Sequence, residues 1–173
     1  MNTEKLRSAI RDIPDFPKPG IIFKDITPVL KDPALFRAAV DLYEQQVRKS
    51  GATKIAAVDA RGFLFAGAVA DRLSIGVVPI RKKGKLPYRT FEQTYDLEYG
   101  TATLTVHEDA FEPKERVALI DDLLATGGTA KAAAQLVERG GAQVVKVAFL
   151  IELAFLKGRS QLTGYDVYSA IVF

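Results

Sequence analysis

Residues 117–141 read VALIDDLLATGGTAKAAAQLVERGG, in which an apolar run precedes two acids, two glycines and a segment rich in alanine. Val117 to Ile120 predicts a buried strand, and Ala130 to Arg139 predicts a helix that ends at Gly140-Gly141. A strand that passes by a short turn into a helix is the unit from which parallel sheets are built. This stretch therefore predicts an α/β fold.

The same alternation of strand and helix continues on both sides of this stretch. Lys54 to Val58 predicts a strand and Phe63 to Leu73 a helix, with a short turn between them. Further strands are expected at Val77 to Ile80, at Thr101 to Val106, at Val144 to Ile151 and within Asp166 to Phe173. The pattern predicts a mostly parallel central sheet flanked by helices. Such sheets bind ligands at the carboxyl ends of their strands, which selects the turns 59–63 and 121–129.

Two more helices are expected near the start of the chain. Leu6, Ile10 and Ile13 recur at helical spacing. Asp32-Pro33 predicts the start of the second helix, because Asp caps a helix and Pro at the first position loses no hydrogen bond. That helix is expected to end at Ser50-Gly51.

The composition is that of one globular domain spanning residues 1–173. The chain is 48% hydrophobic and 26% charged, which is enough apolar material for a core. Lys and Arg number 24 against 21 Asp and Glu, and this net charge of +3 argues against a nucleic-acid partner. The absence of Cys excludes disulfides, thiolate metal sites and cysteine nucleophiles. His107 is the single histidine, so a His-rich metal site is excluded as well.

The charged N-terminus lacks the apolar stretch of a signal peptide. No apolar run approaches the roughly 20 residues that span a bilayer. We therefore expect no membrane partner and a cytoplasmic location.

The turn after Ile120 carries the clearest candidate site. Asp121 and Asp122 cannot both be buried unpaired, because desolvation costs several kcal/mol each, so they must face solvent, a cation or ligand hydroxyls. Backbone N–H groups of residues 125–129, at a helix N-terminus, can converge on a phosphate. Two acids followed by such a loop would suit a sugar phosphate. The alternative is an ordinary turn between strand and helix, with exposed acids and no ligand. Neither a Walker ending nor a G-x-G-x-x-G run is present.

VALIDDLLATGGTA, residues 117–130, resembles the phosphoribosyl diphosphate (PRPP) motif of the type I phosphoribosyltransferases, in the form typical of members that act on adenine. Further matches follow in the expected order along the chain. They are DFPKPGIIFKDITPVLKDP (15–33), DARGFLFAG (59–67), IRKKGKLP (80–87), YDLEYGT (95–101) and LIELAFLKGR (150–159).

The resemblance implies a small N-terminal hood at about residues 1–30 and a mobile flap at about residues 81–106. It implies purine salvage, in which the 5-phosphoribosyl group passes from PRPP to adenine and gives AMP and pyrophosphate. Mg²⁺ would be held through PRPP and water, with no direct protein ligand, and the protein would be a homodimer. Two alternatives stay open: transfer to another purine (hypoxanthine, guanine or xanthine), and a PRPP-binding regulator without catalysis.

The resemblance also assigns roles to individual residues. Those assigned to PRPP are Arg61, Arg81, Lys82, Lys85, Asp121, Asp122, Ala125, Thr126, Gly127, Gly128 and Thr129. Glu98 is assigned to catalysis, and Ile22, Phe23 and Lys24 to adenine. Lys24 departs from the family, which often has Arg there.

The residues alone leave other interpretations open. Arg61 could be a surface residue, and the cations from Arg81 to Arg89 could form a solvated loop. Glu98 could be an exposed residue before a turn, and Phe23 could be part of the core. His107, between a strand and two acids, is expected on the surface.

Overall fold

The computed structural model describes residues 3–96 and 100–173. The chain divides into two compact units, an N-terminal unit of residues 1–42 and a sheet unit of residues 43–173. No helix among the described residues has both the length and the apolar character needed to cross a bilayer.

The N-terminal unit is built on a short antiparallel hairpin. Its elements are α1 (Thr3–Ala9), β1 (Arg11–Pro14), β2 (Ile22–Asp25), α2 (Thr27–Lys31) and the start of α3 (Pro33–Ser50). Ile13 of β1 pairs with Phe23 of β2. The helical spacing expected through Ile13 is therefore wrong beyond Ala9. Pairing with β2 holds residues 11–14 extended, and Pro14 has no N–H to offer a helix.

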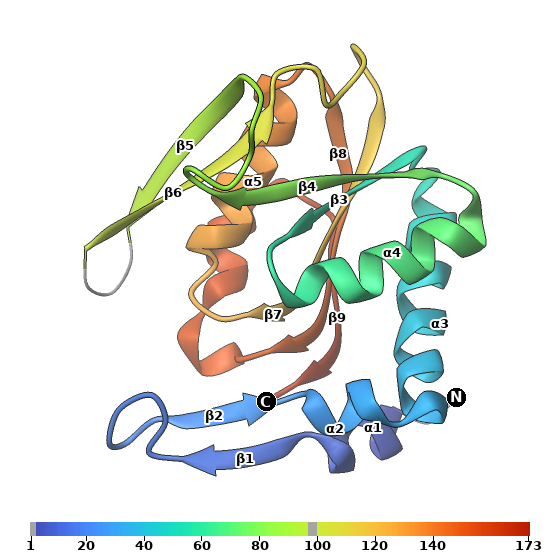
Figure 1. Ribbon diagram of the computed structural model, residues 1–173. Coiled ribbons are helices and arrows are strands. Elements are labelled where there is room, and N and C mark those ends of the chain that lie inside the picture. Colours follow the sequence, from blue (N-terminus) through green and yellow to red (C-terminus); the bar gives the residue numbers. More distant parts are fainter. Residues whose placement is uncertain (1–2, 97–99) are drawn as a thin grey trace. The chain divides into compact units, whose positions relative to one another are not determined.

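The sheet unit contains a seven-stranded sheet in the order β5-β6-β4-β3-β7-β8-β9 (Figure 1). The strands are β3 (Lys54–Val58), β4 (Gly76–Lys82), β5 (Thr90–Asp96), β6 (Thr101–His107), β7 (Arg116–Leu124), β8 (Gln143–Glu152) and β9 (Val167–Val172). The five strands from β4 to β9 in this order run parallel, and β6 and β5 join them as an antiparallel hairpin. The predicted mostly parallel sheet with flanking helices is confirmed.

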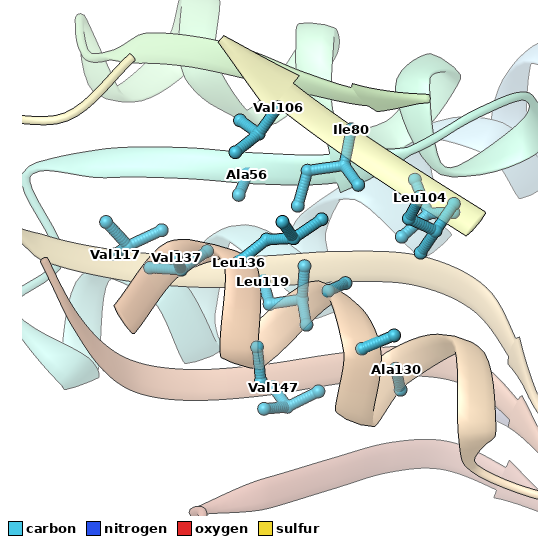
Figure 2. Close-up of a cluster of buried hydrophobic side chains, with 14 of the residues drawn as sticks. Ala56, Ile80, Leu104, Val106, Val117, Leu119, Ala130, Leu136, Val137 and Val147 are labelled. Carbon is cyan, nitrogen blue, oxygen red and sulfur yellow. The ribbon is translucent and has the colours of Figure 1, made fainter. Parts of the chain in front are cut away.

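The sheet unit also contains two further α-helices and two short 3-10 helices. They are α4 (Arg61–Leu73), α5 (Gly128–Arg139), and the 3-10 helices η1 (Ala154–Leu156) and η2 (Gly158–Leu162). α5 packs on one face of the sheet, where Leu136 and Val137 meet Leu119 of β7 (Figure 2). Because side chains alternate along a strand, Ile120 points to the other face, beside α4.

Three departures from the expected elements bear on the site. β7 continues past Ile120 to Leu124, so the two acids lie inside the strand; its pairing with β8 extends as far as Leu124 and Glu152. α4 begins at Arg61 and α5 at Gly128, each two residues earlier than expected. β5 was not expected, although TFEQTYD alternates between more and less exposed residues along its length.

Candidate active site

The sheet register brings two turns to the same edge. β3 and β7 pair in parallel, with Ala57 opposite Ile120, so the segments that follow both strands emerge side by side. They border a cleft of about 370 Å³ within the sheet unit. The residues that line it are Val58, Asp59, Ala60, Arg61, Lys82, Tyr95, Leu104, Asp121, Asp122, Leu123, Leu124, Ala125, Thr126, Gly127, Thr129 and Ala130.

An ion pair joins the first residue of α4 to β7 at this cleft. Arg61 Nε donates to Asp122 Oδ2 at 2.5 Å, and Asp122 is only 6% exposed. The buried acid thus has a cation beside it, as desolvation requires. The Arg61 side chain is 43% exposed, so it can also reach a ligand in the cleft.

Asp121 is held differently from its neighbour. Its Oδ1 accepts the backbone N–H of Asp122 at 2.8 Å. Burial, and then the negative charge of Asp122, raise the pKa of the Asp121 carboxyl well above its ordinary value. The cleft therefore presents two adjacent carboxyl groups, and the charge of one disfavours the charge of the other.

Two residues outside β7, Tyr43 and Gly62, support Asp121. The hydroxyl of Tyr43 donates to the Asp121 carbonyl at 2.8 Å. Gly62 lets the first turn of α4 approach β7, because a Cβ there would lie 3.0 Å from the Ile120 carbonyl oxygen and 3.1 Å from Asp121 Oδ1. Tyr43 gave no signal beyond its place on the apolar face of α3.

Residues 125–129, here called the phosphate loop, enter α5 as expected. Gly127 caps the helix with a φ of +88°, a left-handed conformation that suits glycine. The first N–H groups of a helix have no partner within it, and Gly127, Thr129 and Ala130 at the start of α5 line the cleft. Thr129 Oγ1 donates to the hydroxyl of Tyr95 at 3.2 Å. Tyr95, which comes from β5, is a further lining residue that the sequence did not indicate.

The cations at the end of β4 and just after it separate into two groups. Lys82 lines the cleft, together with Arg61. Arg81 instead donates through Nε to Asp59 Oδ2 at 2.8 Å and through Nη1 to the Lys85 carbonyl at 3.1 Å. Neither Arg81 nor Lys85 is among the lining residues, and their predicted contact with pyrophosphate stays a prediction. Gly128 borders a neighbouring hollow between β5 and α5.

The residues predicted to bind adenine belong to the N-terminal unit. Ile22, Phe23 and Lys24 belong to β2 in the N-terminal unit. Phe23 packs edge-on against Phe16 with ring centroids 5.3 Å apart, and Lys24 Nζ pairs with Asp12 Oδ1 at 2.6 Å. Glu98 lies outside the described residues. Within residues 3–96 and 100–173, no group of three or more His, Cys, Asp or Glu side chains could hold a metal ion.

Comparison with known proteins assigns the chain to a family. The model of the phosphoribosyl transferase domain matches residues 26–168. Adenine phosphoribosyltransferase of Desulfitobacterium hafniense (strain Y51) is 57% identical over 164 residues, which are 95% of each chain. The chain belongs to the adenine phosphoribosyltransferase family. The resemblance of its motifs to type I phosphoribosyltransferases is thereby confirmed.

Solved structures of adenine phosphoribosyltransferases have the same fold. That of Thermoanaerobacter pseudethanolicus superposes with a TM-score of 0.96 at 51% identity, covering 99% of both chains. That of Saccharomyces cerevisiae, in complex with adenine and an imino-altritol bisphosphate, has a TM-score of 0.93 at 36% identity and covers 97% of both chains.

The raised pKa of Asp121 predicts that Asp121→Asn stabilises the ligand-free protein. When the pKa of a carboxyl rises on folding, the free energy of unfolding falls as the pH increases above the ordinary pKa of the group, about 3.9. Asn carries no charge and keeps the oxygen that accepts the Asp122 N–H. We expect the Tm at pH 7 to rise by about 2–4 °C, the shift that about 1 kcal/mol gives at this size. Thermal melts from pH 3.5 to 8 should show the two proteins converging at the acidic end, and an equal gap at every pH would contradict the explanation.

Proposed function

We propose that the protein transfers the 5-phosphoribosyl group of PRPP to adenine, giving AMP and pyrophosphate in purine salvage. The observation that carries the proposal is the meeting, in one cleft, of the Asp121–Asp122 pair and the N-terminus of α5. The family of the chain and the adenine found in the Saccharomyces cerevisiae complex support the choice of base.

PRPP binds along the edge of the sheet in this proposal. The carboxyl groups of Asp121 and Asp122 accept hydrogen bonds from the ribose hydroxyls. The phosphate loop, Ala125 to Thr129, binds the 5′-phosphate through its N–H groups and hydroxyls. Arg61 and Lys82 hold the pyrophosphate, because both line the same cleft. Arg81 and Lys85 are proposed to assist from the start of the flap.

The reaction is a displacement at the ribosyl carbon. A ring nitrogen of adenine forms the new C–N bond while the C–O bond to pyrophosphate breaks, and the electron pair leaves with the pyrophosphate. The cations stabilise the negative charge on the leaving group, and the acids stabilise the positive charge on the ribose. Glu98 is proposed to act here, either on the proton that the purine loses or on the ribosyl charge. Rate enhancement comes mainly from positioning and electrostatics.

Mg²⁺ is proposed as the cofactor, carried in on PRPP. Phosphoribosyltransferases generally use this ion with PRPP. The cleft is compatible with this, because Asp121 and Asp122 would face the ion only through water or through the ribose hydroxyls, and Mg²⁺ readily keeps water and phosphate oxygens as its ligands. When bound, it offsets charge on the departing pyrophosphate.

The other proposals concern a flap, an N-terminal hood and the oligomeric state. β5 and β6 pair as antiparallel strands, and we propose that a flap of about residues 81–106 closes over the ribose. Closure would keep water from the ribosyl cation. We also propose an N-terminal hood of about residues 1–30 that grips adenine through Ile22, Phe23 and Lys24. A homodimer that works in the cytoplasm, where phosphorylated substrates are retained, completes the proposal.

A base panel tests this function. Purified protein with Mg²⁺ and PRPP is offered adenine, hypoxanthine, guanine or xanthine, and nucleotide is followed by chromatography. We expect AMP from adenine and no nucleotide from the others. A site whose polar groups pair with the donors and acceptors of one purine leaves those groups unpaired when a different purine binds. IMP, GMP or XMP would keep the PRPP site and overturn the choice of base. No nucleotide from any base, with PRPP still bound, would identify a regulator.

A further inference from the structure

The phosphate loop meets the segment 154–162 backbone to backbone. A Cβ on Gly158 would lie 2.1 Å from the carbonyl oxygen of Ala125 and 3.0 Å from the backbone nitrogen of Gly127. In the reverse direction, a Cβ on Gly127 would lie 2.3 Å from the Gly158 carbonyl oxygen. These distances leave no room for a side chain on either glycine, so each backbone limits where the other can lie.

The segment 154–162 is itself anchored to the sheet, chiefly by Arg159. Its Nε and Nη2 donate to the two carboxylate oxygens of Glu152, at 3.1 and 2.5 Å. Nη1 donates to the Val167 carbonyl at 2.9 Å, and Nη2 also reaches Ser169 Oγ at 3.3 Å. Glu152 is only 6% exposed and lies at the end of β8. One side chain therefore ties this segment to both β8 and β9.

A further bond places the segment beside the loop. The backbone N–H of Leu153 donates to the Leu124 carbonyl at 2.9 Å, directly before the phosphate loop begins. Gly158 then returns to the loop at Ala125 and Gly127. The path from β8 to Gly158 thus contacts the chain just before the loop and again within it.

We infer that Gly158 and Arg159 are positioning residues for the phosphate subsite: they fix the backbone of residues 125–127 so that its N–H groups converge on the 5′-phosphate of PRPP. The inference rests on the proposed function. Backbone donors bind a phosphate only if the loop holds its shape, and the loop contributes no bulky side chain of its own to hold it. Gly158 supplies the missing support from outside.

Gly158→Ala tests this directly. The added methyl group must displace the Ala125 carbonyl, and misplacing binding groups by about 1 Å can cost up to about 100-fold. We expect the KM for PRPP and the Kd for ribose 5-phosphate to rise about 10-fold or more, while the KM for adenine stays within about two-fold of wild type. Ribose 5-phosphate binding is measured by titration calorimetry and the KM values by initial rates.

Gly164→Ala is the control. Gly164 has a positive φ, +92°, which Gly158 does not have, and its Cβ would meet no atom within 4 Å, so this variant carries more backbone strain than Gly158→Ala without touching the loop. Equal PRPP and ribose 5-phosphate affinities in the two variants would overturn the inference. If Gly158→Ala does not fold, Arg159→Lys replaces it, since Lys keeps the charge opposite Glu152 but loses the fork of donors. Its ribose 5-phosphate affinity is expected to fall, and a wild-type value would overturn the inference.

The two proposals fail in different ways. A wild-type protein that binds ribose 5-phosphate but forms no nucleotide would refute the proposed reaction, and the binding titrations would still test Gly158. A wild-type protein that forms AMP while Gly158→Ala keeps a normal KM for PRPP would refute the positioning role alone.

Discussion

Replacing Asp122 with Asn is expected to lower kcat/KM for PRPP about 100-fold, or about 2.7 kcal/mol, the size of one lost charge-assisted hydrogen bond. Asn cannot offer a charged acceptor to the ribose hydroxyls, and it presents only a neutral acceptor to Arg61 Nε in place of the present ion pair. Initial rates at varied PRPP and saturating adenine give the ratio. An unchanged rate at low PRPP would rule out the ribose role.

Asp109→Asn is the control for this change. Asp109 is exposed in the turn after β6 and does not line the cleft. The same loss of one carboxylate there is expected to leave kcat/KM within about two-fold of wild type, as surface substitutions usually do. Equal losses in the two variants would point to net charge instead of to the site.

Replacing Arg61 with Ala in the otherwise unchanged protein is expected to lower kcat/KM for PRPP about 100-fold, because a bidentate phosphate contact and a partner of a buried acid are lost together. Arg61→Lys should recover only part of this loss, since Lys offers a point charge in place of a planar fork. Rates with varied PRPP, and inhibition by pyrophosphate, measure both changes. Arg48→Ala, on the exposed side of α3, serves as the control.

The Asp122–Arg61 pair allows a sharper test. Because the two side chains bond each other at 2.5 Å, the losses should not multiply in the double variant Asp122→Asn/Arg61→Ala. We expect the double variant to be less impaired than the product of the single losses. Strictly multiplicative losses would mean that the two residues bind PRPP independently.

The sequence predicted most of the sheet because its parallel strands are short apolar runs followed by turns. β7 and α5 have the expected order, and their junction at Gly127 is where the glycines indicated it. β5 escaped prediction because TFEQTYD is half polar and is stabilised mainly by pairing with β6. The helix expected through Ile13 failed because pairing with β2 outweighed a local spacing signal.

The candidate site was predictable where its chemistry is local in sequence. Asp121, Asp122 and the two glycines lie within a stretch of nine residues that can be recognised in the sequence. Arg61 lies in the turn 59–63, which follows the other strand selected by the sequence pattern. Tyr43 and Gly158 could not be found in this way. Tyr43 acts on a residue 78 positions away, and Gly158 is important only because the Ala125 carbonyl lies against it. Such contacts depend on the folded register, which no short motif records.

The boundary between the two units, at Leu42 and Tyr43, separates the positions proposed for adenine from those proposed for PRPP. The positions proposed for adenine are encoded in the first forty-two codons. Those proposed for PRPP, including the whole phosphate loop, are encoded in the remainder, and so is Gly158. Recombination that exchanges this first part of the gene would replace, in one step, the whole segment proposed to recognise the base. If that proposal holds, duplicated genes could acquire new base preferences without any change in the positions proposed to bind PRPP, and a mutant library confined to those codons would be the economical way to change the base.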